Sequence, residues 1–118
     1  WQGIDPVLAI RELKGAIFHF HAKDTFIDKY KVAVNGVLDT KRYSKIADRS
    51  FIFRTVGYGN GESFWRDIIS ALKTAGYDYV VSIEHEDALM SKNEGLEKAA
   101  DFLNNLLIKD TAGEMWWA

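Results

Sequence analysis

Apolar residues recur at the spacing of amphipathic helices in three parts of the chain, at positions 5–15, 63–76 and 91–107. A residue with a capping side chain opens each segment: Asp5, Ser63 and Ser91. The first two segments end at a glycine, and Glu94 follows Ser91 with the spacing of a capping box. The pattern therefore predicts three helices.

Two further segments, at positions 16–21 and 77–84, are rich in β-branched and aromatic residues and alternate with a period of two. One face of each carries polar side chains: His19 and His21 in the first, Ser82 and Glu84 in the second. Because these strands alternate with the helices, the sequence predicts βαβ units, a parallel sheet and the α/β class.

Residues 25–50 show no sustained periodicity, and Asn35-Gly36 within them is a turn signal. We expect a long loop insertion here, placed over a binding site as a lid. Residues 51–54 are expected to form a short extended piece, and the glycine-rich residues 57–61 a flexible turn that could present N–H groups to an anion.

The chain has 118 residues, of which 47% are hydrophobic, enough for one domain or less. Two strands do not close a sheet, so we expect the chain to borrow strands from elsewhere. It starts with Trp1 rather than Met, and we expect it to begin inside a longer polypeptide. No apolar run is long enough for a membrane span and no signal segment opens the chain, so a cytoplasmic protein without membrane contact is expected.

The charge and the cysteine content exclude several kinds of partner and site. Fifteen basic and seventeen acidic residues give a net charge of -2 with no basic block, so no nucleic-acid partner is expected. The absence of cysteine removes disulfides, thiolate catalysis and thiolate metal sites. Only His, Asp and Glu could hold a metal ion.

His21 and Glu84 are the principal site candidates because each ends a predicted strand on its carboxyl side, where parallel α/β proteins bind ligands. An imidazole and a carboxylate suit Mn, Mg, Co or Zn. The alternatives are a hydrogen-bonded or exposed histidine and a glutamate that reaches solvent. In the acidic run after Glu84, Glu86 and Asp87 are weaker candidates and fit a solvated loop equally well.

Three more residues are candidates for contacts with a substrate. Asp24 stands three residues after His21 and could orient its imidazole or meet a substrate hydroxyl, or could simply cap a turn. Arg54 lies among apolar residues and could grip a hydroxyl, carboxylate or phosphate, or form a surface ion pair. His19 lies below His21 on the same strand face.

Taken together, these segments resemble the xylose-isomerase-like TIM-barrel superfamily of sugar (phosphate) isomerases and epimerases, which is related to endonuclease IV. The resemblance is carried by residues 18–24, by residues 54–59 ahead of Trp65, and by residues 76–79 leading to 82–87. These pieces cover most of the chain and occur in the family's order. The resemblance implies that residues 1–118 are the C-terminal part of one (β/α)8 barrel, with its strands seven and eight.

The resemblance also implies a site. The family binds one divalent cation through Glu, Asp, His and Glu from successive strands; His21 matches the histidine and Glu84 the last glutamate. Glu84 would be catalytic as well, exchanging a proton of a sugar or sugar phosphate through an enediolate. Arg54 resembles the arginine that contacts substrate in the epimerases. The other two ligands are expected upstream of Trp1.

Two other functions stay open. One is a metal-dependent hydrolase similar to endonuclease IV, against which the three histidines and the lack of basic surface count. The other is a non-catalytic fragment that self-associates. Apolar surface left by the missing strands, together with Trp116-Trp117, is expected to make the chain a homo-oligomer.

Overall fold

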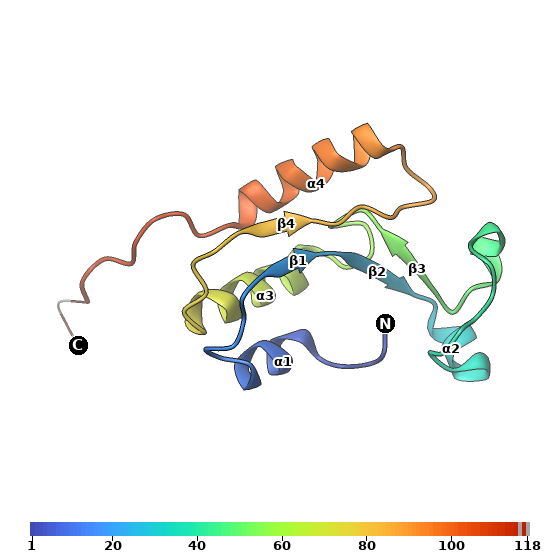
Figure 1. The fold of residues 1–118 in the computed structure, drawn as a ribbon, viewed down its shortest axis with the longest axis horizontal. Helices are drawn as coiled ribbons and strands as arrows, with labels where there is room; N and C mark the ends of the chain where they lie inside the picture. The colour runs from blue at the N-terminus through green and yellow to red at the C-terminus, as the bar shows by residue number, and fades with distance from the viewer. Residues whose placement is uncertain (116, 118) are drawn as a thin grey trace.

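The structure is a computed structural model that describes residues 1–115 and 117. Helices and short strands alternate along the chain (Figure 1). In order they are α1 (Pro6–Glu12), β1 (Phe20–Ala22), β2 (Asp24–Ile27), α2 (Lys29–Asn35), the 3-10 helix η1 (Tyr43–Asp48), β3 (Phe51–Arg54), α3 (Glu62–Thr74), β4 (Val81–Ile83) and α4 (Lys92–Leu106). The fold is mixed α/β, in agreement with the class expected from the sequence.

The strands form two separate pairs. β1 and β4 are parallel, with Phe20 opposite Val81 and His21 opposite Ser82. β2 and β3 form an antiparallel ribbon in which Asp24 lies opposite Arg54. The chain connects β1 to β4 through the ribbon and α3, so the expected parallel pairing across a helical connection is confirmed.

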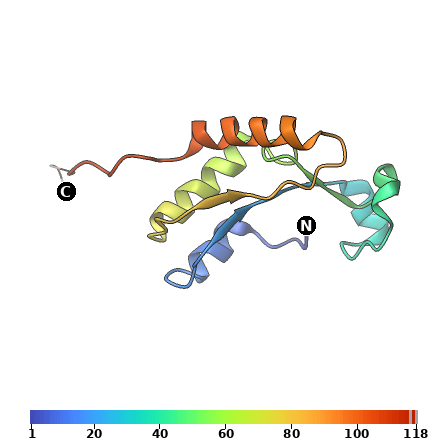
Figure 2. The same ribbon diagram turned by 45° about the horizontal axis from the view of Figure 1, so that its top comes forward.

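The hydrophobic core lies between one face of the β1–β4 pair and the helices. Figure 1 shows α3 behind the two strands, with α1 and α4 on either side of it, and Figure 2 shows the same layering from above. The buried core residues are Ile10, Ala22, Val56, Trp65, Ile68, Ile69, Ala71, Leu72, Ala99, Leu103 and Leu106. Because strand side chains alternate, burial of Ala22 on this face leaves His21 exposed on the other.

The three predicted helices are present as α1, α3 and α4, with one error at a cap, whereas α2 and η1 were not predicted. The Asp5 carboxylate accepts the N–H of Val7, and the Ser91 hydroxyl accepts the N–H of Glu94. Ser63 is not the cap of the second helix: α3 begins at Glu62 behind Gly61. The glycine-rich turn delivers the chain in extended conformation at Gly61, so the helix starts earlier than side-chain capping predicted.

The strands are shorter than the sequence predicted. Alternation indicated strands over 16–21 and 77–84, whereas the ladder pairs only Phe20–Ala22 with Val81–Ile83. At the first residue of the ladder, the N–H of Phe20 donates to the Tyr77 hydroxyl at 3.0 Å and thus to a side chain instead of a strand carbonyl. Periodicity identifies which side chains share a face, but the length of a strand depends on how many backbone hydrogen-bonding groups the neighbouring strand presents to it.

Residues 25–50 are more regular than the expected loop. They contain most of β2 together with α2 and η1, and Asp28 caps α2 by accepting the N–H groups of Tyr30 and Lys31. No residue of α2 is buried, so its apolar residues gave no core-facing stripe to detect. Whether this segment is an insertion relative to other members of its fold family stays a prediction.

Several large apolar side chains are exposed. Tyr30 and Val34, one turn apart on α2, are 89% and 85% exposed, and Phe18, ahead of β1, is 84% exposed. Trp116, which the sequence assigned to a self-association surface, lies outside the described residues. In the part of the chain that the structure describes, no helix has both the length and the apolar character needed to cross a bilayer.

A buried carboxylate joins the start of the ribbon to the turn that follows it. Asp24 is 1% exposed. Its oxygens accept six hydrogen bonds, from the N–H groups of Thr25, Gly57, Gly59 and Asn60, the Asn60 side-chain amide and the Trp65 indole. Gly59 is packed so closely that an added Cβ would lie 2.6 Å from the Thr25 carbonyl carbon. The turn at 57–61 is therefore fixed by hydrogen bonding and is not the flexible turn expected.

We expect Asp24→Asn to lower the free energy of unfolding by about 2–4 kcal/mol, because its NH2 group must face an N–H donor in either orientation. Urea denaturation measures the change. Asp78→Asn, at an exposed position outside the helices and strands, is the matched control and should change stability by less than about 0.5 kcal/mol. Equal stabilities of the two variants would contradict this assignment of Asp24.

Candidate functional site

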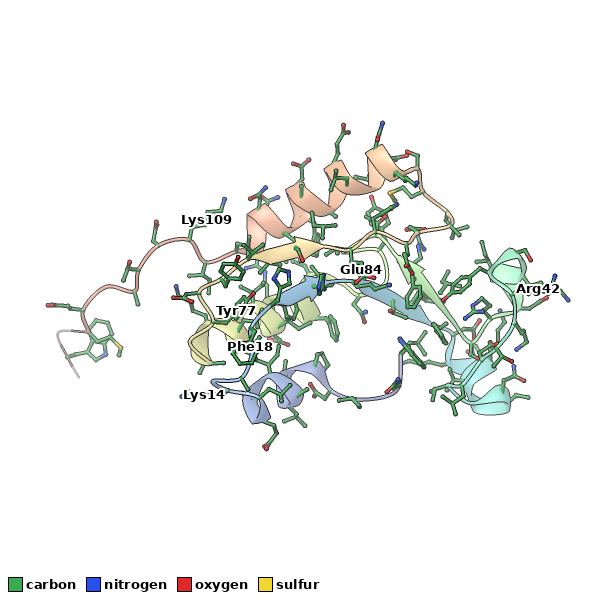
Figure 3. The ribbon with its side chains drawn as sticks, in the orientation of Figure 1. Lys14, Phe18, Arg42, Tyr77, Glu84 and Lys109 are labelled. Carbon is green, nitrogen blue, oxygen red and sulfur yellow. The ribbon has the colours of Figure 1, made fainter. Side chains whose placement is uncertain are left out.

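The parallel pairing of β1 and β4 brings the two principal candidates to the same end of the strands. Glu84 extends the ladder by one step, since its N–H donates to the Ala22 carbonyl at 3.0 Å. Two-residue alternation places Glu84 on the same face as Ser82, the residue opposite His21. Figure 3 shows Glu84 at the carboxyl end of β4, beside β1. The shared end and face of these residues agree with the sequence prediction, and their role in a site stays a prediction.

The Ser82 hydroxyl contacts two imidazole rings, that of His21 in β1 and that of His19 just before this strand. Its Oγ lies 2.8 Å from His19 Nε2 and 3.1 Å from His21 Nδ1. The hydroxyl also donates to the Phe20 carbonyl, which can only accept. Since a hydroxyl has one proton, we assign N–H groups to both ring nitrogens that face Oγ. His21 Nε2 is then left with its lone pair, as a metal-ligating histidine requires.

Lys23 is a site residue that the sequence reasoning missed. Its ammonium lies 2.6 Å from Glu84 Oε1 and 3.0 Å from Glu86 Oε2. It also lies 4.2 Å from the centre of the Phe53 ring. The alternation of strand side chains could have indicated this role. Lys23 lies two positions after His21 and Glu86 two positions after Glu84, so each continues the face of the residue before it.

The charges of this trio reinforce one another. The hydrogen bond from Lys23 is the main cause that lowers the pKa of Glu84 below its ordinary value, and the nearby His21 acts in the same direction. Partial burial acts to lower the pKa of Lys23, but its bonds to Glu84 and Glu86 outweigh this and raise it. Glu84 is thus a carboxylate and Lys23 an ammonium at neutral pH.

Arg54 and Asp87 form a second ion pair next to this group. Arg54 Nε lies 3.0 Å from Asp87 Oδ2, and the Asp87 side chain is fully buried. The same carboxylate accepts the N–H groups of Thr55 and Leu89. Burial acts to raise the pKa of Asp87, but these bonds outweigh it and the pKa is lowered. Asp87 therefore belongs to a closed network and not to the solvated loop considered for the acidic run.

The remaining candidates lie in different surroundings. Asp24 is enclosed by N–H donors, so a substrate hydroxyl could reach it only by displacing one of them. His85, next to Glu84, packs its ring against Gly95 of α4, and its Nδ1 has no partner among the described residues. Arg42, in the segment expected to act as a lid, lies at one end of the molecule, whereas Glu84 lies near its middle (Figure 3). The roles of Asp24, Arg54 and His19 as substrate contacts stay predictions.

His21 and Glu84 fit half of a divalent metal site. A neutral imidazole nitrogen whose partner nitrogen is held by a hydroxyl, together with an ionised carboxylate, is a donor pair suited to Mn, Co or Zn. The described residues contain no group of three or more His, Asp or Glu side chains that could hold an ion. The donor chemistry of this chain fits the ion, and further ligands would have to come from outside the described residues.

A helix-flanked parallel strand pair with ionisable residues at the carboxyl ends is the arrangement of α/β proteins that bind ligands at strand ends. The sequence profile of the xylose isomerase-like TIM barrel family matches residues 1–106, and the chain belongs to this family. The family includes sugar isomerases and epimerases as well as enzymes like endonuclease IV, and its members often use divalent metals.

Among curated proteins, the chain is similar to an uncharacterized protein of Bacillus subtilis (strain 168), YfiH. The two are 39% identical over 107 residues, which are 91% of this chain and 34% of the relative. The chain thus spans about a third of the relative's length. The family resemblance expected from the sequence is confirmed, and the chain corresponds to a part of a TIM barrel.

The protonation assigned to His21 can be measured without metal. We expect Ser82→Ala to remove the acceptor that holds the proton on Nδ1, so that the ring populates both tautomers. The two ring 15N chemical shifts of His21, recorded at alkaline pH where imidazoles are neutral, should then move toward each other. Ser70→Ala, which removes a hydroxyl bonded to the Arg66 carbonyl in α3, is the control. Unchanged His21 shifts in Ser82→Ala would show the assignment to be wrong.

Proposed function

We propose that the chain is the C-terminal part of a divalent-metal-dependent isomerase or epimerase of sugars or sugar phosphates. In this proposal β1 and β4 are barrel strands seven and eight. The observation that carries it is the position of His21 and Glu84 at the carboxyl ends of paired parallel strands, with the Ser82 hydroxyl 3.1 Å from His21 Nδ1. Membership of the family supplies the reaction class.

The residues of this chain would divide the work as follows. Glu84 takes the proton from the carbon next to the substrate carbonyl, which leaves an enediolate. In an isomerase it delivers this proton to the former carbonyl carbon, and in an epimerase a second acid outside the described residues protonates the opposite face. Glu84 must be ionised to accept the proton, and in the metal-free chain the hydrogen bond from Lys23 favours that form. A divalent cation, when bound by His21 and Glu84 with ligands from elsewhere, supplies polarisation of the carbonyl.

Substrate hydroxyls need donors and acceptors around this centre. We propose Arg54 and His19 as contacts, because Arg54 is 18% exposed beside its Asp87 partner and His19 lies on the same open face as His21. Asp24 is proposed as a contact only from its position three residues after His21. A hydrolase like endonuclease IV remains the alternative within the family.

The proposal predicts that Mn²⁺ binding depends on His21. In a titration of the chain followed by electron paramagnetic resonance, we expect His21→Ala to weaken Mn²⁺ binding at least about tenfold. Glu94→Gln, which removes a carboxylate from the exposed pair with Lys98 on α4, is the control and should leave the affinity unchanged.

Activity is tested alongside, by mass spectrometry of ketoses and aldoses incubated with Mn²⁺ in deuterated water. The longer Bacillus relative is assayed in parallel. Deuterium incorporation by the relative but not by this chain would identify a non-catalytic fragment of an isomerase. Absence of exchange in both, or unchanged Mn²⁺ affinity in His21→Ala, would contradict the proposal.

We further propose that the chain associates with a second copy of itself. Tyr30 and Val34 lie one turn apart on α2, and Leu38 follows Gly36, the residue that ends the helix; the three side chains are 89%, 85% and 79% exposed. Burying these apolar side chains against those of a second copy is the simplest way to remove them from water.

Sedimentation velocity tests this association. The wild type is expected to sediment as a dimer or larger species at micromolar concentration, and the double substitution Val34→Lys with Leu38→Lys as a monomer. Leu96→Lys introduces the same charge at an exposed leucine of α4 and should not change the wild-type distribution. A monomeric wild type would rule the association out.

A further inference from the structure

Lys23 places a positive charge beside Glu84 Oε1, an oxygen atom that would also coordinate a metal ion. Its Nζ lies 2.6 Å from Glu84 Oε1, a short contact for an ammonium and a carboxylate. A metal ion binds a carboxylate oxygen at about 2.0–2.2 Å, so the two cations would be close neighbours at the same oxygen. Mutual repulsion across such a distance makes joint occupancy unfavourable.

The surroundings of Lys23 provide a second position for its charge. Glu86 Oε2 lies 3.0 Å from the same nitrogen, and the Phe53 ring lies 4.2 Å away on the apolar side. Lys23 can therefore leave Glu84 while it keeps one carboxylate and one aromatic contact. Its side chain is 24% exposed and Glu84 is 41% exposed, so neither is locked in place by packing.

The contacts of Lys23 differ from those of the lysine ion pairs that serve only the structure. The other lysine pairs of the described residues, such as Lys98 with Glu94, join neighbours on one helix or one loop. Lys23 instead bridges two carboxylates that lie more than sixty positions away in the sequence and at the carboxyl end of the opposite strand. One of these two carboxylates belongs to Glu84, the proposed metal ligand.

We propose that Lys23 is a resident cation of the site that competes with the divalent metal for Glu84. Without metal it pairs with Glu84; when metal binds, it moves to Glu86 alone. Lys23 thereby weakens metal binding. This inference rests on the proposed function only in taking Glu84 as a metal ligand.

The test is Mn²⁺ affinity of the chain carrying Lys23→Met, which removes the charge and keeps the side-chain length. Electron paramagnetic resonance titration should give binding about three- to tenfold tighter than in the wild type. Lys23→Arg, which keeps the charge, should bind like the wild type. Lys98→Met removes a lysine paired with Glu94 at 2.9 Å and controls for the change in net charge.

The outcomes separate this inference from the proposed function. Equal or weaker Mn²⁺ binding by Lys23→Met, while His21→Ala still weakens binding at least about tenfold, overturns the role of Lys23 and leaves the function standing. Absence of Mn²⁺ binding in wild type, Lys23→Met and Lys23→Arg overturns both. Binding by Lys23→Met alone supports the inference most strongly. Circular dichroism verifies folding, and Lys23→Gln replaces Lys23→Met if that variant does not fold.

Discussion

The carboxylate of Asp24 ties together parts of the chain that lie more than thirty positions apart. It stands at the junction where the chain leaves β1 and enters the antiparallel ribbon, and it collects the N–H groups of the turn that opens α3. A buried carboxylate is costly unless its oxygens are satisfied, and here donors surround both of them. The direction in which the chain departs from the strand end, and so the position of Lys23 beside Glu84, depends on this arrangement.

Much of the secondary structure is local enough to be predicted from the sequence. Asp5 and Ser91 predict helix starts because each caps its helix through short-range hydrogen bonds. The alternation of His21 with Ala22 assigns these two residues to the correct faces of β1. Residues 51–54 were expected to be extended and form β3, but β2 and its pairing with β3 were missed. The register of this ribbon comes from distant residues, such as Asp24 with Arg54, and leaves no periodic trace. The extent of β1 was overestimated for the same reason.

The site shows the same division between local and distant information. His21 and Glu84 could be named because a residue that ends a strand is a local feature, and the strand-end rule supplies the rest. Ser82 and Lys23 gain their roles only from the register of β1 against β4. Asp24 was chosen for its nearness to His21, but the amide groups that it binds come from the turn after β3. Sequence spacing alone could not indicate that these amides would face it.

The separation between His21 and Glu84 has a consequence for folding. The two residues become neighbours only when β1 and β4 pair, and that pairing encloses the ribbon and α3 in one large loop. Closing a loop of this size comes late, because its entropy is lost before the contacts that repay it are made. The two candidate residues are therefore brought together late in folding. A chain that has formed the ribbon and α3 but has not yet paired β1 with β4 keeps His21 and Glu84 apart, so that no single ion could contact both.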